Sequence, residues 1–396
     1  MKQLLSWCET EQPWMDETIE ALVRLESPTT DKAAVDACGR ELAARLGTID
    51  GRVRRYPREA AGDHLLAEFG RGTRQVLLLA HIDTVWPVGS LAALPLRREG
   101  DRWFGPGIYD MKAGLAIAMQ ALRALRSSAE GLPGRVVLLC TTDEETGSET
   151  SRALIEDVAR RSNAVLVFEP SLPGGAVKTQ RKGCGEFTLR VRGVAAHAGI
   201  EPGRGSNAIH ELARQILAVE SLQDPGRGLS VNVGLVHGGT RTNVIAAEAE
   251  AMVDVRVTSM EDARRLTAAL RALRTTIPGT SLDVTGGVNR PPFERTPGGL
   301  GLFRQARALA AEVDRELDEG ATGGGSDGNF TAALGVPTLD GLGAVGGGAH
   351  ALDEHVEAAH LPWRAALAAG LIRQILVAKA GLGTVDGRQW TADSRQ

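Results

Sequence analysis

Short apolar runs alternate with amphipathic stretches through the first half of the chain. The runs VLLLA (76–80), VVLLC (136–140) and AVLVF (164–168) are apolar throughout, as strands are when helices bury both of their faces. Residues 112–125 and 151–160, which lie between these runs, carry apolar residues at helical spacing. This order predicts an α/β fold with a mixed, mostly parallel sheet flanked by helices. Functional side chains are expected at the carboxyl ends of its strands.

A different texture begins near Gly183. The segments EFTLRVRG (186–193) and AEAMVDVRV (249–257) alternate apolar with polar residues, which is typical of a sheet with one face in water. Helical spacing marks residues 206–222 and 261–277. The resulting order of strand, helix, two strands, helix and strand predicts a small α+β sandwich inserted into the first domain.

Past this insertion the pattern returns to a helix, a glycine-rich loop, a short strand at 336–339 and a last helix at 361–379. This C-terminal segment is expected to complete the first domain. The predicted division is a first domain of residues 1–182 and 292–396, which is split in sequence, and an inserted domain of residues 183–291.

Length and composition narrow the class of protein. The 396 residues exceed the roughly 250–300 at which single cores stop growing, so two domains fit the length. With 43% hydrophobic and 24% charged residues, the chain has a globular rather than a disordered or fibrous composition. Its formal net charge is -4 and it has no basic run, so the sequence indicates no basic surface for binding nucleic acid or an anionic membrane. A small-molecule substrate is therefore expected.

Cysteine usage and the start of the chain bear on its compartment. The four cysteines, at positions 8, 38, 140 and 184, are widely spaced and form no CxxC pair. Neither a disulfide framework nor a thiolate zinc site is therefore indicated. The first apolar stretch is too short for the core of a signal peptide, and no run approaches the roughly 18 apolar residues that span a bilayer. Cytoplasmic residence is the default expectation.

Two segments offer the first candidate metal ligands. In AHIDTVWP, His81 ends an apolar strand and Asp83 lies two residues on, on the same side. A metal-bound imidazole usually needs a carboxylate on its other nitrogen, and Asp83 is placed for that role. The glycine-rich turn in GPGIYDMKAG delivers Asp110, whose two oxygens could bridge two cations about 3.5–4 Å apart. Taken alone, His81 could equally be structural, and Asp110 a helix cap.

Three further segments add carboxylates and an imidazole. Adjacent Glu144 and Glu145 follow the VVLLC strand in TTDEETGS. Neighbouring residues at a strand end point differently, so one can bind metal while the other takes the proton of a water that the metals acidify. An isolated pair of this kind is usually a solvated acidic patch. The next strand ends in VFEPS with Glu169, and GGGAHALDEH places His350 in a glycine-rich loop. Five such donors at successive strand ends indicate a metal site.

The order AHIDTV, GPGIYDMKAG, TTDEETGS, FEPS and GGGAHALDE resembles the glutamate carboxypeptidases, acetylornithine deacetylases and succinyl-diaminopimelate desuccinylases over nearly the whole chain. These are di-zinc metallopeptidases with a zinc exopeptidase-like catalytic domain. The resemblance implies two Zn2+ per subunit, for which Co2+ or Mn2+ can substitute, and a cis peptide bond after Asp110. It implies that one ion is held by His81, Asp110 and Glu169 and the other by Asp110, Glu145 and His350, with Asp110 as the bridge.

The same resemblance assigns roles around the metals. Glu144 is expected to be the general base, and Asp83 to orient His81. The inserted domain matches the family's lid, which forms the interface of a homodimer. In VAAHAGIEPGRGSN, His197 stands where the family uses a histidine that stabilises the developing oxyanion across the dimer. Without the resemblance, a surface histidine before a turn would be the commoner outcome.

Three residues resemble the substrate contacts of the family. Asn243 and Arg256 lie in GGTRTNVIAAEAEAMVDVR, and Arg290 lies in NRPPF. A guanidinium fork suits a substrate carboxylate, although Arg256 could equally pair with an acid of the lid. FEPS, the GGGSDGNF loop and NRPPF make the bacterial glutamate carboxypeptidases the most similar branch.

Together these features predict a zinc hydrolase that cleaves a C-terminal, acidic, glutamate-like residue from N-acyl amino acids or short peptides. Two alternatives stay open. One is an N-acyl amino acid deacylase or dipeptidase with the same machinery, which would differ in its pocket for the leaving group. The other is a noncatalytic peptide-binding protein on this scaffold. The presence of both Glu144 and His197 argues against the latter, because neither is needed to bind zinc.

Overall fold

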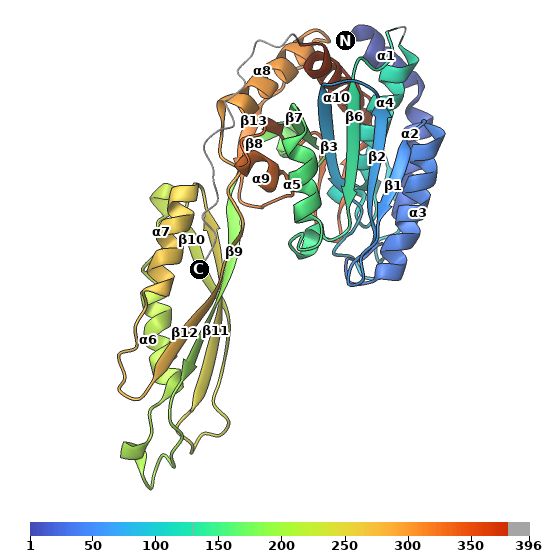
Figure 1. The fold of residues 1–396 in the computed structure, drawn as a ribbon. Coiled ribbons are helices and arrows are strands. Elements are labelled where there is room, and N and C mark those ends of the chain that lie inside the picture. The colour runs from blue at the N-terminus through green and yellow to red at the C-terminus, as the bar shows by residue number, and fades with distance from the viewer. Residues whose placement is uncertain (129, 379–396) are drawn as a thin grey trace.

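A computed structural model describes residues 1–128 and 130–378. A six-stranded sheet forms the centre of the larger of its two units (Figure 1). Four of the strands run parallel, and two more continue the sheet antiparallel at one edge. In order across the sheet, the strands are β1 (Arg52–Tyr56), β2 (His64–Gly70), β6 (Arg135–Thr141), β3 (Gln75–His81), β7 (Ala164–Val167) and β14 (Thr338–Leu339).

Helices pack on both faces of this sheet. Successive residues of β3 alternate between two cores: Leu78 belongs to one and Leu77 and Leu79 to the other, and all three are fully buried. The continuous apolar run at 76–80 is therefore a strand buried on both faces, as predicted. The first core includes α1 (Lys2–Thr10), α2 (Gln12–Arg24), α3 (Lys32–Thr48), α4 (Ala113–Ser127), α8 (Pro297–Ala311) and α10 (Leu361–Val377), and the second includes α5 (Arg152–Arg160) and α9 (Gly328–Ala333).

The second unit is a four-stranded antiparallel sheet with two helices. Its elements follow the predicted order, and burial alternates along β11 because the helices cover only one face. In chain order the elements are β9 (Gly183–Arg192), α6 (Ala208–Glu220), β10 (Ser230–Gly238), β11 (Glu248–Val257), α7 (Met260–Arg271) and β12 (Ser281–Arg290). The strands lie across the sheet in the order β10, β11, β9 and β12.

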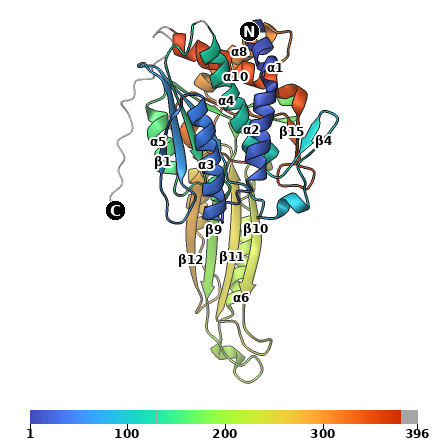
Figure 2. The same ribbon diagram turned by 90° about the vertical axis from the view of Figure 1, so that its right-hand side faces the viewer.

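This second unit extends away from the larger one, with the segment between β9 and α6 at its far end (Figures 1 and 2). β9 has ten residues. Since a strand rises about 3.3 Å per residue, that far end lies roughly 30 Å from the point where the chain enters the unit.

The two chain crossings between the units are held together. Arg181 and Phe293 exchange both backbone hydrogen bonds, at 3.0 and 3.1 Å. Asn329 Nδ2 donates to the backbone carbonyls of Lys182 and Pro291, at 3.1 and 2.8 Å. The side chain of Asn329, in the larger unit, therefore hydrogen-bonds to both crossings.

Two small sheets complete the larger unit. One pairs β8 (Val177–Arg181) in parallel with β13 (Glu319–Thr322). The other contains β15 (Gly346–Gly347), β16 (His355–Glu357), β5 (Arg102–Phe104) and β4 (Arg97–Glu99), all antiparallel. None of the helices in residues 1–128 and 130–378 is long and apolar enough to cross a membrane.

Some predicted boundaries differ from the structure. The helix predicted to reach residue 277 ends at Arg271, because the β-branched residues and Pro278 that follow disfavour helix. The strand predicted at 336–339 pairs only at Thr338 and Leu339, after Pro337, which has no N–H to donate. Residue 379, the predicted end of the last helix, lies outside the described residues.

Candidate metal centre and active site

The candidate metal ligands meet at one edge of the six-stranded sheet. His81 is the last residue of β3, Glu145 lies in the turn after β6, and Glu169 lies two residues after β7. Because these strands are parallel, their carboxyl ends share one edge of the sheet. Asp110 reaches this edge from the turn before α4. The peptide bond between Asp110 and Met111 is cis, as expected. His350 reaches it from the loop after β15.

The ligands form two groups that share Asp110. In the first, His81 Nε2 lies 3.3 Å from Asp110 Oδ1 and 3.5 Å from Glu169 Oε1. In the second, His350 Nε2 lies 3.5 Å from Asp110 Oδ2 and 3.4 Å from Glu145 Oε2. Within each group the three ligand atoms lie within 4.8 Å of one another. The two oxygens of Asp110 thus face different groups, which is the arrangement that a bridging carboxylate needs.

Both groups have the electrostatics of a cation site. Asp110 Oδ1 and Glu145 Oε1 are buried without a hydrogen-bond partner among the described residues, which is costly for a carboxylate. Burial raises the pKa of Glu145. Burial also acts to raise the pKa of Asp110, but the nearby imidazoles of His350 and His81 hold the pKa of Asp110 below its usual range. In return, hydrogen bonds to Asp110 and Glu145 raise the pKa of His350 to about 10. Protonated imidazoles balance the carboxylates here, and a divalent ion would replace those protons. Carboxylate and imidazole donors suit Zn2+.

Asp83 is fully buried next to His81. His81 Nδ1 lies 2.9 Å from the backbone carbonyl oxygen of Asp83 and 3.4 Å from its Oδ1, which directs a proton on Nδ1 toward Asp83 and leaves Nε2 for a metal. Asp83 Oδ2 accepts hydrogen bonds from Thr29 Oγ1 at 2.7 Å and from the backbone N–H of Glu145 at 3.2 Å. Asp83 therefore links a ligand of the first group to a ligand of the second.

Glu144 belongs to neither group and is held by Arg290, the last residue of β12. Arg290 Nη1 donates to Glu144 Oε1 at 2.6 Å, and its Nη2 donates to the Glu144 backbone carbonyl at 2.6 Å and to Ser148 Oγ at 2.7 Å. Burial raises the pKa of Glu144 well above its usual value, and the nearby Arg290 opposes that rise. In this arrangement Arg290 is 5% exposed and faces a carboxylate of its own chain. Its predicted contact with substrate stays a prediction.

His197 forms an isolated β-bridge with Val244, and the Ala198 N–H donates to the Asn243 carbonyl at 2.9 Å, so His197 and Asn243 lie on neighbouring segments past the end of β9 that is distant from the chain crossings. The segment between β9 and α6 lies at the far end of the second unit (Figure 1). His197 Nδ1 accepts hydrogen bonds from the backbone N–H groups of Gly199 and Ile200, both at 3.2 Å. A neutral imidazole that accepts at Nδ1 carries its proton at Nε2. The exposed ring thus offers a hydrogen-bond donor, which is what a developing oxyanion requires.

Arg256 lies at the other end of β11, near the chain crossings. Its Nε and Nη2 donate to the two carboxylate oxygens of Asp254, each at 2.9 Å. Its Nη1 lies 2.7 Å from Cys184 Sγ. Of the two partners that the sequence left open for Arg256, the structure shows the acid of the lid.

Two buried residues that the sequence motifs left unassigned contact the ligands. Arg181 Nη2 donates to Glu169 Oε2 at 3.2 Å, and its Nε donates to Asp340 Oδ2 at 2.6 Å. Glu354 accepts hydrogen bonds from the turn that carries Asp110. Arg181 lies in RKGCG and Glu354 in GGGAHALDEH. A charged residue inside a motif is a signal that the residue belongs to the site. Its partners, however, are distant in sequence and could not be predicted from spacing.

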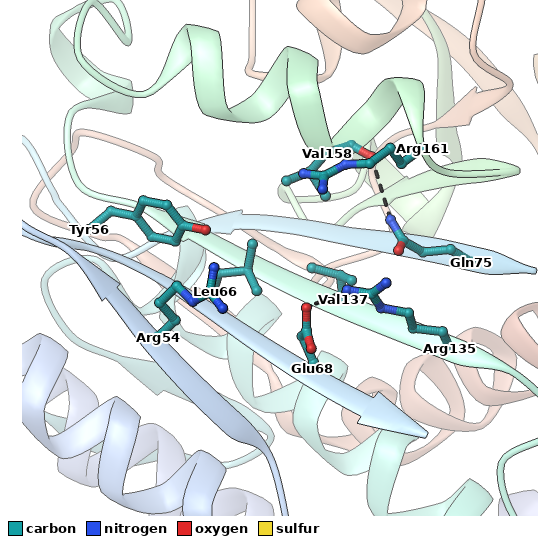
Figure 3. Close-up of a pocket in the computed structure, with 9 residues that line it drawn as sticks. All are labelled: Arg54, Tyr56, Leu66, Glu68, Gln75, Arg135, Val137, Val158 and Arg161. Carbon is teal, nitrogen blue, oxygen red and sulfur yellow. Dashed lines mark hydrogen bonds and ion pairs between the residues drawn. The ribbon is translucent and has the colours of Figure 1, made fainter. Parts of the chain in front are cut away.

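A small cavity lies elsewhere, over β1, β2 and β6 (Figure 3). Arg54, Arg135 and Arg161 line it together with Glu68 and Gln75. Its volume of about 40 Å³ holds only a few waters, since each needs at least about 10–15 Å³. This space is too small for an acyl amino acid, and the candidate active site is the ligand cluster.

Comparison with known proteins places the chain in a family. Residues 77–374 match peptidase family M20/M25/M40. Carboxypeptidase G2 from Pseudomonas sp. (strain RS-16) is 34% identical over 373 residues, which cover 92% of this chain and 90% of that protein. A succinyl-diaminopimelate desuccinylase from Xylella fastidiosa (strain 9a5c) is 31% identical over 341 residues, covering 81% of this chain and 88% of that protein.

Solved structures share the fold. Aminopeptidase PepT from Bacillus cereus ATCC 10987 superposes with a TM-score of 0.75 at 22% identity, covering 92% of this chain and 98% of that one. The M20 family metallo-carboxypeptidase Sso-CP2 from Sulfolobus solfataricus gives a TM-score of 0.74 at 16% identity, covering 92% and 99%. These likenesses confirm the predicted fold class. The sequence matches show that the chain belongs to peptidase family M20/M25/M40, and that it is a hydrolase of the metallopeptidase and amidohydrolase type.

Proposed function

We propose that this protein removes a C-terminal, acidic, glutamate-like residue from N-acyl amino acids or short peptides by hydrolysing its amide bond. The observation that carries the proposal is a pair of three-ligand groups that share Asp110, with Glu144 beside them but in neither. That arrangement separates metal binding from proton transfer, which are the two tasks of such a site. The ions in the proposal are two Zn2+ per subunit.

The residues of the chain divide the work. His81, Asp110, Glu145, Glu169 and His350 would hold the two ions. When bound, such ions polarise an amide carbonyl and make water more acidic. Glu144 takes the proton of the attacking water on its carboxylate and returns it to the leaving amine. Arg290 keeps that carboxylate in place through its 2.6 Å contact.

Preference for an acidic residue would come from arginines near the site. Arg256 and Arg290 each pair with a carboxylate of the chain, Asp254 and Glu144. A substrate carboxylate could bind the same guanidinium beside its present partner, because a guanidinium fork has five donors. The name of carboxypeptidase G2, which is 34% identical, supports cleavage at a carboxyl terminus.

A homodimer would complete the active site. His197 lies roughly 30 Å along the lid from the chain crossings, by the length of β9, so it serves the partner's metals more readily than its own. Large apolar side chains are exposed on α6 and on the edge strand β10, among them Leu217 and Leu235. Such residues favour an interface between subunits. The proposed catalytic domain is residues 1–182 and 292–396, and the proposed lid and dimerisation domain is residues 183–291.

An N-acyl amino acid deacylase is the second candidate, supported by the 31% identity to a succinyl-diaminopimelate desuccinylase. It would use the same metals and base on a different leaving group. The two candidates, and a noncatalytic peptide-binding protein, differ in what they release from a panel of substrates.

The test is an assay of released amino acid from matched substrates. N-acylated glutamate, alanine and lysine with one acyl group, and the corresponding dipeptides, are incubated with chelator-treated protein and with the same protein reloaded with Zn2+. We expect hydrolysis only after reloading, and fastest for glutamate. Equal rates for all three side chains would favour the deacylase or dipeptidase. Bound metal without hydrolysis of any substrate would favour a binding protein.

A further inference from the structure

Glu354 is a buried carboxylate at the meeting point of three loops. Its Oε1 accepts hydrogen bonds from the backbone N–H groups of Tyr109 and Asp110, at 2.9 and 3.0 Å. Its Oε2 accepts from the backbone N–H of Gly107 at 2.9 Å and from Trp86 Nε1 at 2.6 Å. Within the described residues it has no salt-bridge partner, and these four N–H groups are its hydrogen-bond donors.

Those four donors belong to segments that carry metal ligands. Trp86 follows His81 and Asp83 in the loop after β3, and residues 107–110 form the turn that delivers Asp110. Glu354 itself lies four residues after His350. One side chain therefore joins the loops of both histidines to the bridging carboxylate.

The turn at 107–110 is built to present N–H groups to an anion. Gly107 has a φ of +69°, and a Cβ there would lie 2.5 Å from Thr84 Cγ2, so only glycine fits. Successive N–H groups of such a turn converge into a nest for negative charge. Here the nest is filled by Glu354 from the same chain, which fixes the backbone of Asp110 itself.

We propose that Glu354 is a positioning residue for the metal centre. It holds the backbone of Asp110 so that the two carboxylate oxygens of Asp110 face the two ligand groups, and it keeps the His350 loop against the turn at 107–110. The inference rests on the proposed two-metal function. Glu354 touches neither group of ligand atoms directly, because its bonds go to backbone N–H groups and to an indole. Its effect reaches the ions through the placement of Asp110.

Replacing Glu354 tests this placement. In Glu354→Gln one of the two acceptor oxygens becomes an NH2 group, which faces N–H donors and cannot accept from them. Loss of such an outer contact typically lowers metal affinity by about 10–100-fold, and we expect a loss in that range. Glu354→Asp keeps the charge but is one methylene shorter, and should lose less. Glu99→Gln, on the exposed hairpin of β4 and β5, is the matched control and should bind metal as the wild type does.

The readout is metal binding rather than turnover. Each chelator-treated protein is titrated with Zn2+ against a competing chelator, and the visible absorption of its Co2+ form reports the coordination geometry. Circular dichroism identifies folded variants, and if Glu354→Gln is unfolded the decision passes to Glu354→Asp. Weakened binding with an altered Co2+ spectrum supports the proposal. Wild-type affinity and spectrum in a folded variant overturn it. If the wild type itself takes up no metal, the two-metal function fails instead.

Discussion

Mixing two inactive variants should restore hydrolysis if the lid of one subunit completes the active site of the other. His197→Ala removes the proposed oxyanion donor but keeps every metal ligand, whereas His81→Ala removes a ligand but keeps the donor. In a mixed dimer, the metals of the first subunit meet His197 of the second. The other site of that dimer lacks both.

The expected recovery of activity follows from the number of complete sites in the mixture. Random exchange of equimolar subunits makes half of the dimers mixed, and each mixed dimer has one complete site of two, so activity should reach about one quarter of the wild type. A site built within one chain would give no recovery, because neither variant has all of its parts. The roughly 30 Å between the start of β9 and the His197 segment favours the shared site.

The assay compares each variant alone with the mixture, under conditions in which tagged subunits demonstrably exchange. Alone, each variant should release almost no amino acid from the best substrate of the panel. Absence of recovery after verified exchange would refute the shared site. So would a His197→Ala variant that is nearly fully active and merely unfolds at a lower temperature, since the histidine would then only pack its own loop.

Three further predictions address the metals, the interface and the core. Adding Zn2+ to metal-free protein in weak buffer near pH 8 should acidify the solution, because His350, with a pKa of about 10 before metal binds, must lose its proton; a constant pH would contradict this. Leu217→Glu on α6, where the leucine is 66% exposed, should convert dimers to monomers in sedimentation velocity, and unchanged sedimentation would exclude this face. Leu78→Ala, in the centre of β3, should lower the free energy of unfolding in urea by about 2–5 kcal/mol, whereas a loss below 1 kcal/mol would mean that the sheet is not the core.

The central strands and the polar residues at their carboxyl ends could be predicted because one physical cause sets both. The middle of a strand buried on both faces must be apolar, as residues 76–80 of β3 and 136–140 of β6 are, and the polar side chains that follow stand at the carboxyl end of the sheet. The edge strand β1 escaped prediction, because its sequence RVRRY has little apolar alternation. The hairpin of β4 and β5 has strands of three residues, too short for a periodic signal.

The sequence could not predict which side chains pair in the site. Arg290 lies in a recognisable motif, yet its contact with Glu144 spans 146 residues and exists only because the lid strand returns beside the turn after β6. Glu354 likewise bonds to N–H groups more than 240 residues away. A charged residue that becomes buried needs a partner that compensates its charge. The sequence shows the charged residue, but only the fold shows which partner it has.

The division of labour between Glu144 and the metal ligands is most directly tested by Glu144→Gln. Because Glu144 lies outside both ligand groups, the variant should bind the same number of metal ions as the wild type, by elemental analysis of dialysed protein. Its turnover of the best substrate should fall by at least about 10²–10⁴-fold, the usual contribution of a general base. Loss of a metal ion, or turnover within tenfold of the wild type with both ions in place, would contradict the account.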